Sequence, residues 1–278
     1  ILTPFIVTIL GSHYYGIYTL ITRLQSYMAL ADLRPSGVLR YKLASLQNSR
    51  NINEKNEYLS AAIVVSVLSI PFIILIGYLI SVFFINFIKL PQEDYTLVST
   101  AIILLSLIIS SQSLLSIPEA IVRGNNLEYK LVYADILKIL TYGTLVYYFL
   151  SKEFGIIGIL YAIAISIIVE STLKFILQLK YFPQYKPKKP SIDKLKEFTK
   201  SSGWYMGSSF SNQILNSIDI FLILIFFNTE FVTNYAISKM LMHRAAESVG
   251  TITSGITSSI GSLVAESRLI ELNVIRKK

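Results

Sequence analysis

The sequence predicts an all-α membrane protein, a bundle of helices that cross a lipid bilayer several times. Apolar residues make up 53% of its 278 residues and are concentrated in long segments. Charged residues make up only 15%, whereas about 25% is usual in soluble domains. Lipid offers no water to unpaired backbone groups, so these segments are expected to be helices rather than open strands. Together these observations argue against a soluble enzyme, a disordered chain and a fibrous repeat.

Eight apolar segments account for the expected helices. Residues 1–10 are too short to span a bilayer, which needs about 20 residues, and they lack the features of a signal peptide. We therefore expect them to be the outer end of a helix, and the chain to be a fragment. The segment near 59–87 would be about 43 Å long, so it is expected to tilt and to kink at Pro71. The other expected spans lie near 15–33, 95–117, 131–150, 154–178, 203–227 and 232–264.

Basic residues alternate between the two sides of these segments. Of the 25 Lys and Arg residues, 18 lie in every second connection and in the C-terminal tail, whereas the intervening connections hold only Lys89 and Lys152. Basic loops are retained in the cytoplasm, so the alternation predicts which connections are cytoplasmic. It also explains the net charge of +8 without nucleic acid as a partner.

The longest basic connection, 180–202, is the predicted boundary between two parts of the chain. It begins with a Pro- and Lys-rich stretch, and its second half predicts a short amphipathic helix with Ile192, Leu195 and Phe198 on one face. We expect this helix to lie along the inner membrane surface against anionic headgroups, and a solvated basic connector is the alternative. The predicted domains are a first lobe over 1–179, the linker over 180–202 and the start of a second lobe over 203–278.

Polar and charged residues recur at helical spacing inside several predicted spans. A charge at mid-bilayer costs about 2.5–3.5 kcal/mol on insertion scales, so it usually faces a cavity or a partner. Several such helices predict a shared hydrated interior, and cations in it suit an anionic group such as a phosphate or diphosphate. The residues expected to line this path are Arg23, Asn212, Asn216, Asp219, Lys239, His243, Arg244 and Glu247.

Some polar residues in the spans have a structural interpretation instead. The pairs Asp135–Lys138 and Glu170–Lys174 have the spacing of intrahelical ion pairs. The serines between Ser106 and Ser113 are expected to pack or to bond back to the backbone. Gly203–Gly207 has the GxxxG spacing of closely packed helices. For His243 a packed position and a position in the path are equally supported.

The sequence contains no recognisable catalytic or metal-binding pattern. It has no cysteine and only two histidines, which argues against disulfides, thiolate nucleophiles and His-rich metal sites. A phosphate-binding glycine loop, a Ser-His-Asp arrangement and a paired-carboxylate arrangement are also absent from the sequence. We therefore expect neither an enzyme nor a cofactor.

Five segments, in order and spacing, resemble polysaccharide exporters of the Wzx type. Two of them resemble cytoplasmic turns of that family, and these contain Asp32 and Arg123, although Arg34 stands where the family usually has Gly. The five segments are LGSHYYGIYTL (10–20), MALADLRPSGVLRY (28–41), AIVRG (120–124), FGIIGILYA (154–162) and DIFLILIFFNTEFVTNYAISKML (219–241).

The resemblance implies a two-lobe architecture similar to the MATE and MurJ exporters, of which this chain would hold the first lobe and the start of the second. It implies a flippase that moves undecaprenyl-diphosphate-linked oligosaccharide, such as an O-antigen unit, across the bacterial cytoplasmic membrane by alternating access. Membrane lipids and the machinery that polymerises the polysaccharide and sets its chain length are the implied partners. Arg23, Lys239 and Arg244 would hold the diphosphate or acidic sugars, with Asp219 and Glu247 as counter-charges or ion-coupling sites. A MATE-like drug or cation antiporter and, with less support, a membrane-embedded polymerase stay open as alternatives.

Overall fold

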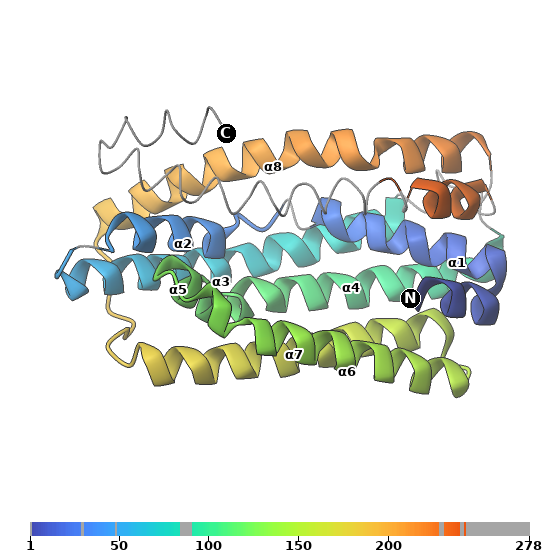
Figure 1. The fold of residues 1–278 in the computed structure, drawn as a ribbon. Helices are drawn as coiled ribbons and strands as arrows, with labels where there is room; N and C mark the ends of the chain where they lie inside the picture. Colours follow the sequence, from blue (N-terminus) through green and yellow to red (C-terminus); the bar gives the residue numbers. More distant parts are fainter. Residues whose placement is uncertain are drawn as a thin grey trace, which may run out of the picture. The chain divides into compact units, whose positions relative to one another are not determined.

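In the computed structural model the described residues form helices joined by turns (Figure 1). The chain divides into two compact units, 1–232 and 233–278. Helices α1 to α8 belong to the first unit, and a further helical stretch covers residues 231–239. The residues that the structure describes are 2–28, 31–47, 49–83, 91–227, 231–239 and 242.

The first unit contains the long apolar helices that the sequence predicts. Among its described residues, four segments are long and apolar enough to cross a membrane, by length and composition alone: Leu2–Gln25, Ile52–Phe83, Gln92–Gly124 and Gly155–Tyr181. These apolar helices confirm the predicted all-α, multi-pass architecture. The long helices are α1 (Leu2–Met28), α3 (Ile52–Phe83), α4 (Tyr95–Leu115), α6 (Val132–Ser151), α7 (Gly155–Tyr181) and α8 (Ile192–Phe226).

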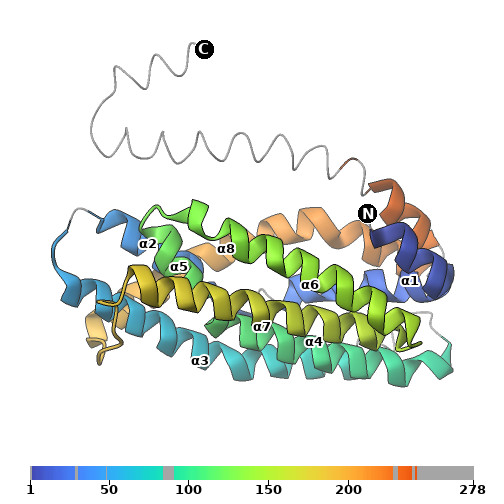
Figure 2. The same cartoon turned by 60° about the horizontal axis from the view of Figure 1, so that its bottom comes forward.

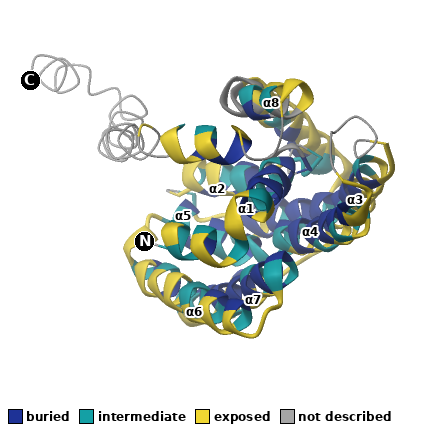
Figure 3. Cartoon of the chain, turned by 90° about the vertical axis from the view of Figure 1, so that its right-hand side faces the viewer, coloured by how far each residue is buried: buried dark blue, intermediate teal, exposed yellow. Residues whose placement is uncertain are grey.

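The outer faces of these helices carry large apolar side chains. Figure 3 shows exposed residues along the outside of α3, α6 and α7, with buried residues on the faces that meet other helices. Phe72 and Leu75 on α3 and Ile139 and Leu140 on α6 are examples, each more than half exposed. An apolar surface of this extent is unfavourable in water but costs nothing in lipid. The protein is therefore a membrane protein.

Helix α1 reverses direction at Gly11. This glycine has φ 75° and ψ 168°, a backbone conformation that glycine adopts without the penalty of a side chain. The segments on both sides contact the same part of α6: Leu2 lies beside Gly143, and the Tyr18 and Tyr142 hydroxyls are 3.4 Å apart. A straight helix would separate residues 2 and 18 by about 24 Å. Figure 1 shows the two segments running in opposite directions, as the predicted break after residue 10 requires.

The connections gather at two opposite ends of the helices. At one end His13 lies 2.7 Å from Asp94. This contact brings together two of the connections that contain few basic residues. At the other end Asn126 donates to Gln47 and Tyr185 donates to Asn125, so three of the basic connections lie together. We call this second end the basic end. The predicted alternation of basic and non-basic connections therefore corresponds to two ends of one helical unit.

Neighbouring helices pack closely along their lengths. Helices α6 and α7 run side by side, as do α3 and α4 (Figure 2). A Cβ atom on Gly77 of α3 would clash with Ser106 of α4, so the two backbones approach as closely as a glycine allows. Ser106, Ser110 and Ser113 of α4 are buried, and Ser106 and Ser110 donate to carbonyl oxygens of their own helix. This arrangement supports the packing interpretation of the serine stripe.

Two short helices at the basic end were not predicted. Residues that the sequence analysis treats as loops form α2 (Pro35–Ser45) and α5 (Ile117–Gly124). Each has a proline in its first turn, where the missing N–H has no intrahelical partner to lose. Helix α3 begins seven residues before the predicted span and continues through Pro71 as one helix.

Helix α8 also differs from its prediction. Its 35 residues join the expected amphipathic helix and the expected span into one continuous helix. Phe198, on the predicted apolar face, is fully buried against α2 and α3, and Leu195 packs beside it. Leu195 and Phe198 therefore contact protein rather than lipid headgroups, because the basic end of α3 offers an apolar surface next to them, whereas Ile192 of the same face is exposed. No other described part of the chain comes within 4 Å of a Cβ on Gly203 or Gly207, so the described residues form no GxxxG packing contact there.

Candidate functional site

Arg23 of α1 lies deep within the membrane-spanning part of the first unit. Met28 lies five residues further along α1, and its Cε atom is 3.8 Å from the Cβ position of Gly77. Ser106, in the middle of α4, borders the same position, so the Met28 side chain reaches the level of Ser106. At 1.5 Å per residue, Arg23 is therefore about 20 Å from the end of α4 at the basic end. An arginine side chain cannot extend to the surface over that distance.

Arg23 belongs to a polar stripe on α1. Tyr15 and Thr19 precede it at intervals of four residues, and both side chains are buried. None of the ion pairs between described residues includes Arg23. Arg23 is thus a half-buried cation inside the membrane without a carboxylate partner in the described part of the chain.

The structure places only some of the other predicted path residues. Asp219 lies near the end of α8, half-buried, and accepts a hydrogen bond from the Ile220 backbone. Lys239 belongs to the second unit and lies over the Tyr235 ring, 5.7 Å from its centroid. The side chains of Asn212 and Asn216, and residues His243, Arg244 and Glu247, lie outside the described part.

Asp32 is held against α4 at the basic end. The Ser113 hydroxyl donates to its carboxylate at 2.8 Å, and burial raises the pKa of the Asp32 carboxyl above its ordinary value. The Ser113 carbonyl in turn accepts a hydrogen bond from Ser66 of α3. The predicted cytoplasmic turn therefore fixes the end of α1 to both α3 and α4.

A chain of ion pairs connects five elements at the basic end. Its buried centre is Lys174 of α7, whose side chain is only 3% exposed and contacts three carboxylates. Glu119, Asp135 and Glu170 lie 2.6, 2.9 and 2.5 Å from its ammonium group. A buried cation is tolerated only when paired in this way. The Glu170–Lys174 pair was predicted, but Asp135 pairs with Lys174 on the neighbouring helix rather than with Lys138.

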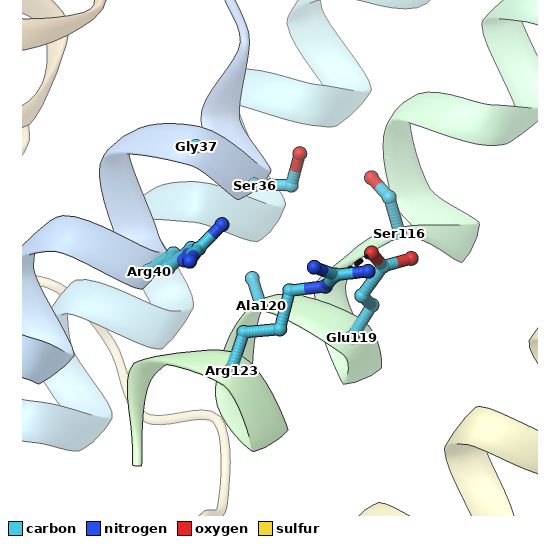
Figure 4. A pocket seen from close by; sticks show the side chains of 7 residues that line it. All are labelled: Ser36, Gly37, Arg40, Ser116, Glu119, Ala120 and Arg123. Atoms are coloured by element: carbon cyan, nitrogen blue, oxygen red, sulfur yellow. Dashed lines mark ion pairs between the residues drawn. The ribbon is translucent and has the colours of Figure 1, made fainter. Parts of the chain in front are cut away.

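The same chain of charges extends to a pocket between α2 and α5. This pocket has a volume of about 330 Å³ and is lined by side chains of both helices (Figure 4). Arg123 of α5 lies 2.6 Å from Glu119, which is also the partner of Lys174. Glu128 pairs with Arg40 of α2 and lies 4.0 Å from Arg123. The complete lining is Ser36, Gly37, Arg40, Ser116, Glu119, Ala120 and Arg123.

Residues 182–191, which we call the strap, bind along the basic end of α3. The Asn56 amide accepts a hydrogen bond from the Lys186 backbone at 3.1 Å and donates to the Gln184 carbonyl. The Ser60 hydroxyl accepts from the Lys188 backbone at 2.7 Å. Backbone groups of the strap are thus bound by side chains of α3, which fixes its path across the first unit.

The first turns of α8 continue this attachment through charged groups. The Lys194 ammonium lies 2.6 Å from Glu54, and hydrogen bonds to Glu54 and Tyr58 raise the pKa of Lys194 well above its ordinary value. Glu197 accepts from Lys42 at 2.6 Å, and this bond lowers the pKa of Glu197. Glu197 also accepts from the Tyr58 hydroxyl, so the three helices α2, α3 and α8 share one cluster.

Sequence reasoning found Arg123 but missed Arg40 and the pocket. Arg123 was predicted as a turn residue, whereas it lies in the last turn of α5, four residues after its partner Glu119. That spacing and the proline at the start of each short helix were the available signals. The approach of α2 to α5 depends on long-range packing and has no signal in the sequence.

Comparison with known proteins supports a role in polysaccharide formation. A family model described as polysaccharide biosynthesis protein matches residues 10–272, which is nearly the whole chain. Searches of curated proteins and of solved structures found no significant match. The family match agrees with the resemblance to Wzx-type exporters in the sequence. This helical membrane protein belongs to the polysaccharide biosynthesis protein family.

Proposed function

We propose that the protein is a flippase that moves lipid-linked oligosaccharide, carried on undecaprenyl diphosphate, across the bacterial cytoplasmic membrane for surface polysaccharide biosynthesis. The observation that carries the proposal is Arg23, a cation deep in a membrane-spanning helix and outside every ion pair of the described residues. An arginine at mid-bilayer costs about 2.5–3.5 kcal/mol on insertion scales, and a hydrated path or an anionic ligand removes much of this cost.

The chemistry of the ligand follows from the guanidinium group and from the family. A guanidinium forms paired hydrogen bonds with phosphate oxygens, which a bare cation substrate cannot accept. The family match to polysaccharide biosynthesis supports a sugar as the cargo, and a sugar carried on a lipid phosphate would bring the anionic group that Arg23 suits. Arg23 therefore fits a lipid diphosphate better than an organic cation.

The remaining path residues have corresponding roles in the proposal. Lys239 and Arg244 would contact the diphosphate or acidic sugars, and Asp219 and Glu247 would balance these charges or bind the coupling ion. Asn212, Asn216 and His243 would offer hydrogen bonds to the sugars. The cycle would alternate access between the two membrane faces without making or breaking a covalent bond, and the polysaccharide polymerase and chain-length machinery would receive the product.

A transport assay in proteoliposomes tests the proposal. The protein is reconstituted with undecaprenyl-diphosphate-linked oligosaccharide that carries a fluorophore, and translocation is measured as protection from a membrane-impermeant quencher. We expect Arg23→Gln to slow translocation at least tenfold, which corresponds to about 1.4 kcal/mol. Arg23→Lys should retain part of the activity because it keeps the charge, and Arg50→Gln, at the basic end, should leave the rate unchanged.

Two results would contradict the proposal. Normal translocation by Arg23→Gln would remove Arg23 from the path. No translocation by the wild-type protein, with export of an organic cation dye by the same vesicles, would favour the antiporter alternative.

A further inference from the structure

We propose that the pocket between α2 and α5 binds the phosphate of a lipid headgroup, with Arg40 and Arg123 as its ligands, and that Glu128 occupies these arginines when the lipid is absent. None of the residues that line this pocket is among the proposed path residues, and its binding of lipid does not depend on the proposed function.

The two arginines approach the pocket from opposite walls. Arg40 projects from α2 and Arg123 from α5, and in Figure 4 both guanidinium groups point toward the space between the helices. The hydroxyls of Ser36 and Ser116 border the same space and supply further donors. Two guanidinium groups with adjacent hydroxyls form a donor set that suits the oxygens of a phosphate.

Glu128 is the group that a phosphate would displace. It lies on the three-residue helix η3 (Glu128–Lys130), its side chain is 48% exposed, and it pairs with both arginines. Exposed ion pairs contribute about 0–1 kcal/mol, so a ligand with more oxygens and a higher charge can replace this carboxylate. A short exposed element also leaves Glu128 free to move into water.

Glu119 does not compete in the same way. Its carboxylate is shared between Arg123, at 2.6 Å, and the buried Lys174, also at 2.6 Å. Lys174 also pairs with Asp135 and Glu170, and Lys138 pairs with Glu170. Without Glu128, the linked cluster therefore holds four cations, Arg40, Arg123, Lys138 and Lys174, against three carboxylates, Glu119, Asp135 and Glu170. The site then carries a net positive charge that a phosphate group neutralises.

Exposed tyrosines at the basic end of the helices favour a lipid as the source of the phosphate. Tyr41 follows Arg40, Tyr129 follows Glu128, and Tyr133 lies one helical turn further on α6. All three side chains are strongly exposed, at 64%, 62% and 81%. Exposed tyrosines at the end of apolar helices are typical of the headgroup layer, where lipid phosphates are the abundant anions.

Lipid retention by the full chain in a neutral detergent tests the site. Phosphatidylglycerol or phosphatidylcholine is titrated against the protein, and bound lipid is counted by native mass spectrometry. One basic side chain at a lipid surface contributes about 1 kcal/mol, or about a fivefold change in affinity. We therefore expect Arg40→Gln with Arg123→Gln to weaken phosphatidylglycerol binding about 25-fold. The matched control, Lys186→Gln with Lys189→Gln, removes the same charge from the same end and should change binding less than twofold.

The Glu128→Gln variant tests the competition, and soluble anions test the source of the phosphate. We expect Glu128→Gln to bind phosphatidylglycerol at least fivefold more tightly, because the neutral amide no longer occupies the arginines. Unchanged binding in the double arginine variant, with its helical content intact by circular dichroism, would overturn the site. Unchanged or weaker binding in Glu128→Gln would overturn the competition. Binding of inorganic diphosphate without preference for phosphatidylglycerol over phosphatidylcholine would overturn the lipid as the ligand.

Discussion

Arg34 adopts a backbone conformation that the sequence analysis did not expect of an arginine. It has φ 50° and ψ 46°, the left-handed region, immediately before Pro35 begins α2. The ring of a following proline disfavours the right-handed helical region for the residue before it. The resemblance to Wzx-type exporters points to Gly at this position, and the observed turn is one that a Gly adopts without strain. The departure from the family pattern therefore leaves the turn intact at a local cost.

Replacement of Arg34 by Gly should stabilise the protein. An L-residue in the left-handed region costs about 1–2 kcal/mol, and glycine recovers part of this while it increases the entropy of the unfolded chain. We expect the free energy of unfolding to rise by about 0.5–1 kcal/mol, measured by thermal unfolding in detergent. Arg50→Gly is the control, since Arg50 has a negative φ and should gain nothing. A lower midpoint for Arg34→Gly would show that the side chain, rather than the backbone, decides stability there.

The candidate site shows which residue roles a sequence reveals. Arg23 was recognisable because a charge in an apolar run is unusual whatever surrounds it. The partners of Lys174 were only partly recognisable, because Glu170 is four residues away on the same helix whereas Glu119 and Asp135 come from other helices. Pairing across helices depends on their packing, and a single sequence does not contain that information.

At the scale of elements, α3 and α4 approach each other closely at Gly77. Ser106 fills the space that a side chain on Gly77 would need. Gly77→Ala should therefore destabilise the protein by about 1–3 kcal/mol through overpacking. The double variant Gly77→Ala with Ser106→Gly moves the small residue to the other helix and should recover most of the loss. An equal loss in single and double variants, measured by thermal unfolding, would locate the strain elsewhere.

The attachment of α8 to α2 and α3 should weaken both at acidic and at strongly basic pH. Glu197 has a lowered pKa, so its contribution is present above the ordinary carboxyl pKa and is lost as the pH falls below about 4.5. Lys194 has a raised pKa, so its contribution is present below about pH 10.5 and is lost as the pH rises beyond that value. Both side chains are partly exposed, so each pair should contribute at most about 1 kcal/mol.

Spin labels on Tyr41 and Ile192 would report this attachment. Both side chains are strongly exposed and lie on α2 and α8, the helices that Lys42 and Glu197 connect. We expect a narrow distance distribution between about pH 5 and 10 and a broader one below pH 4. Glu197→Gln should broaden it already at neutral pH, and Glu93→Gln, at the opposite end of the helices, should not. A distribution that is independent of pH in all three proteins would mean that Phe198 alone fixes the helix.

The success of the element predictions follows from the length of each apolar run. Helices α4, α6 and α7 begin and end within about three residues of their predicted spans, because lipid requires a long uninterrupted apolar segment. The short helices α2 and α5 mix polar and apolar residues over two or three turns, so no periodic pattern distinguishes them from loops. The union of two predicted segments in α8 was missed because the intervening Ser-Ser-Gly has the composition of a turn.

At the scale of the whole molecule, the two ends of the helices predict the orientation of the protein in the membrane. The native sequence has no cysteine, so single cysteines can be introduced as unique labels. We expect a membrane-impermeant maleimide to label Glu93→Cys in intact cells, and Lys186→Cys only after lysis. The basic-loop rule gives this direction, because the strap and its neighbouring connections carry most of the positive charge. The reverse labelling pattern would place the basic end outside.

The continuity of α8 connects the charged cluster at the basic end with the opposite end of the helices. The strap and Phe198 hold its first turns, and the helix continues without interruption to Phe226. These two phenylalanines are about 42 Å apart along the axis, and Ile220, near the far end, is fully buried. We therefore expect a rearrangement among Lys42, Tyr58 and Glu197 to shift the contacts of α8 along its whole length.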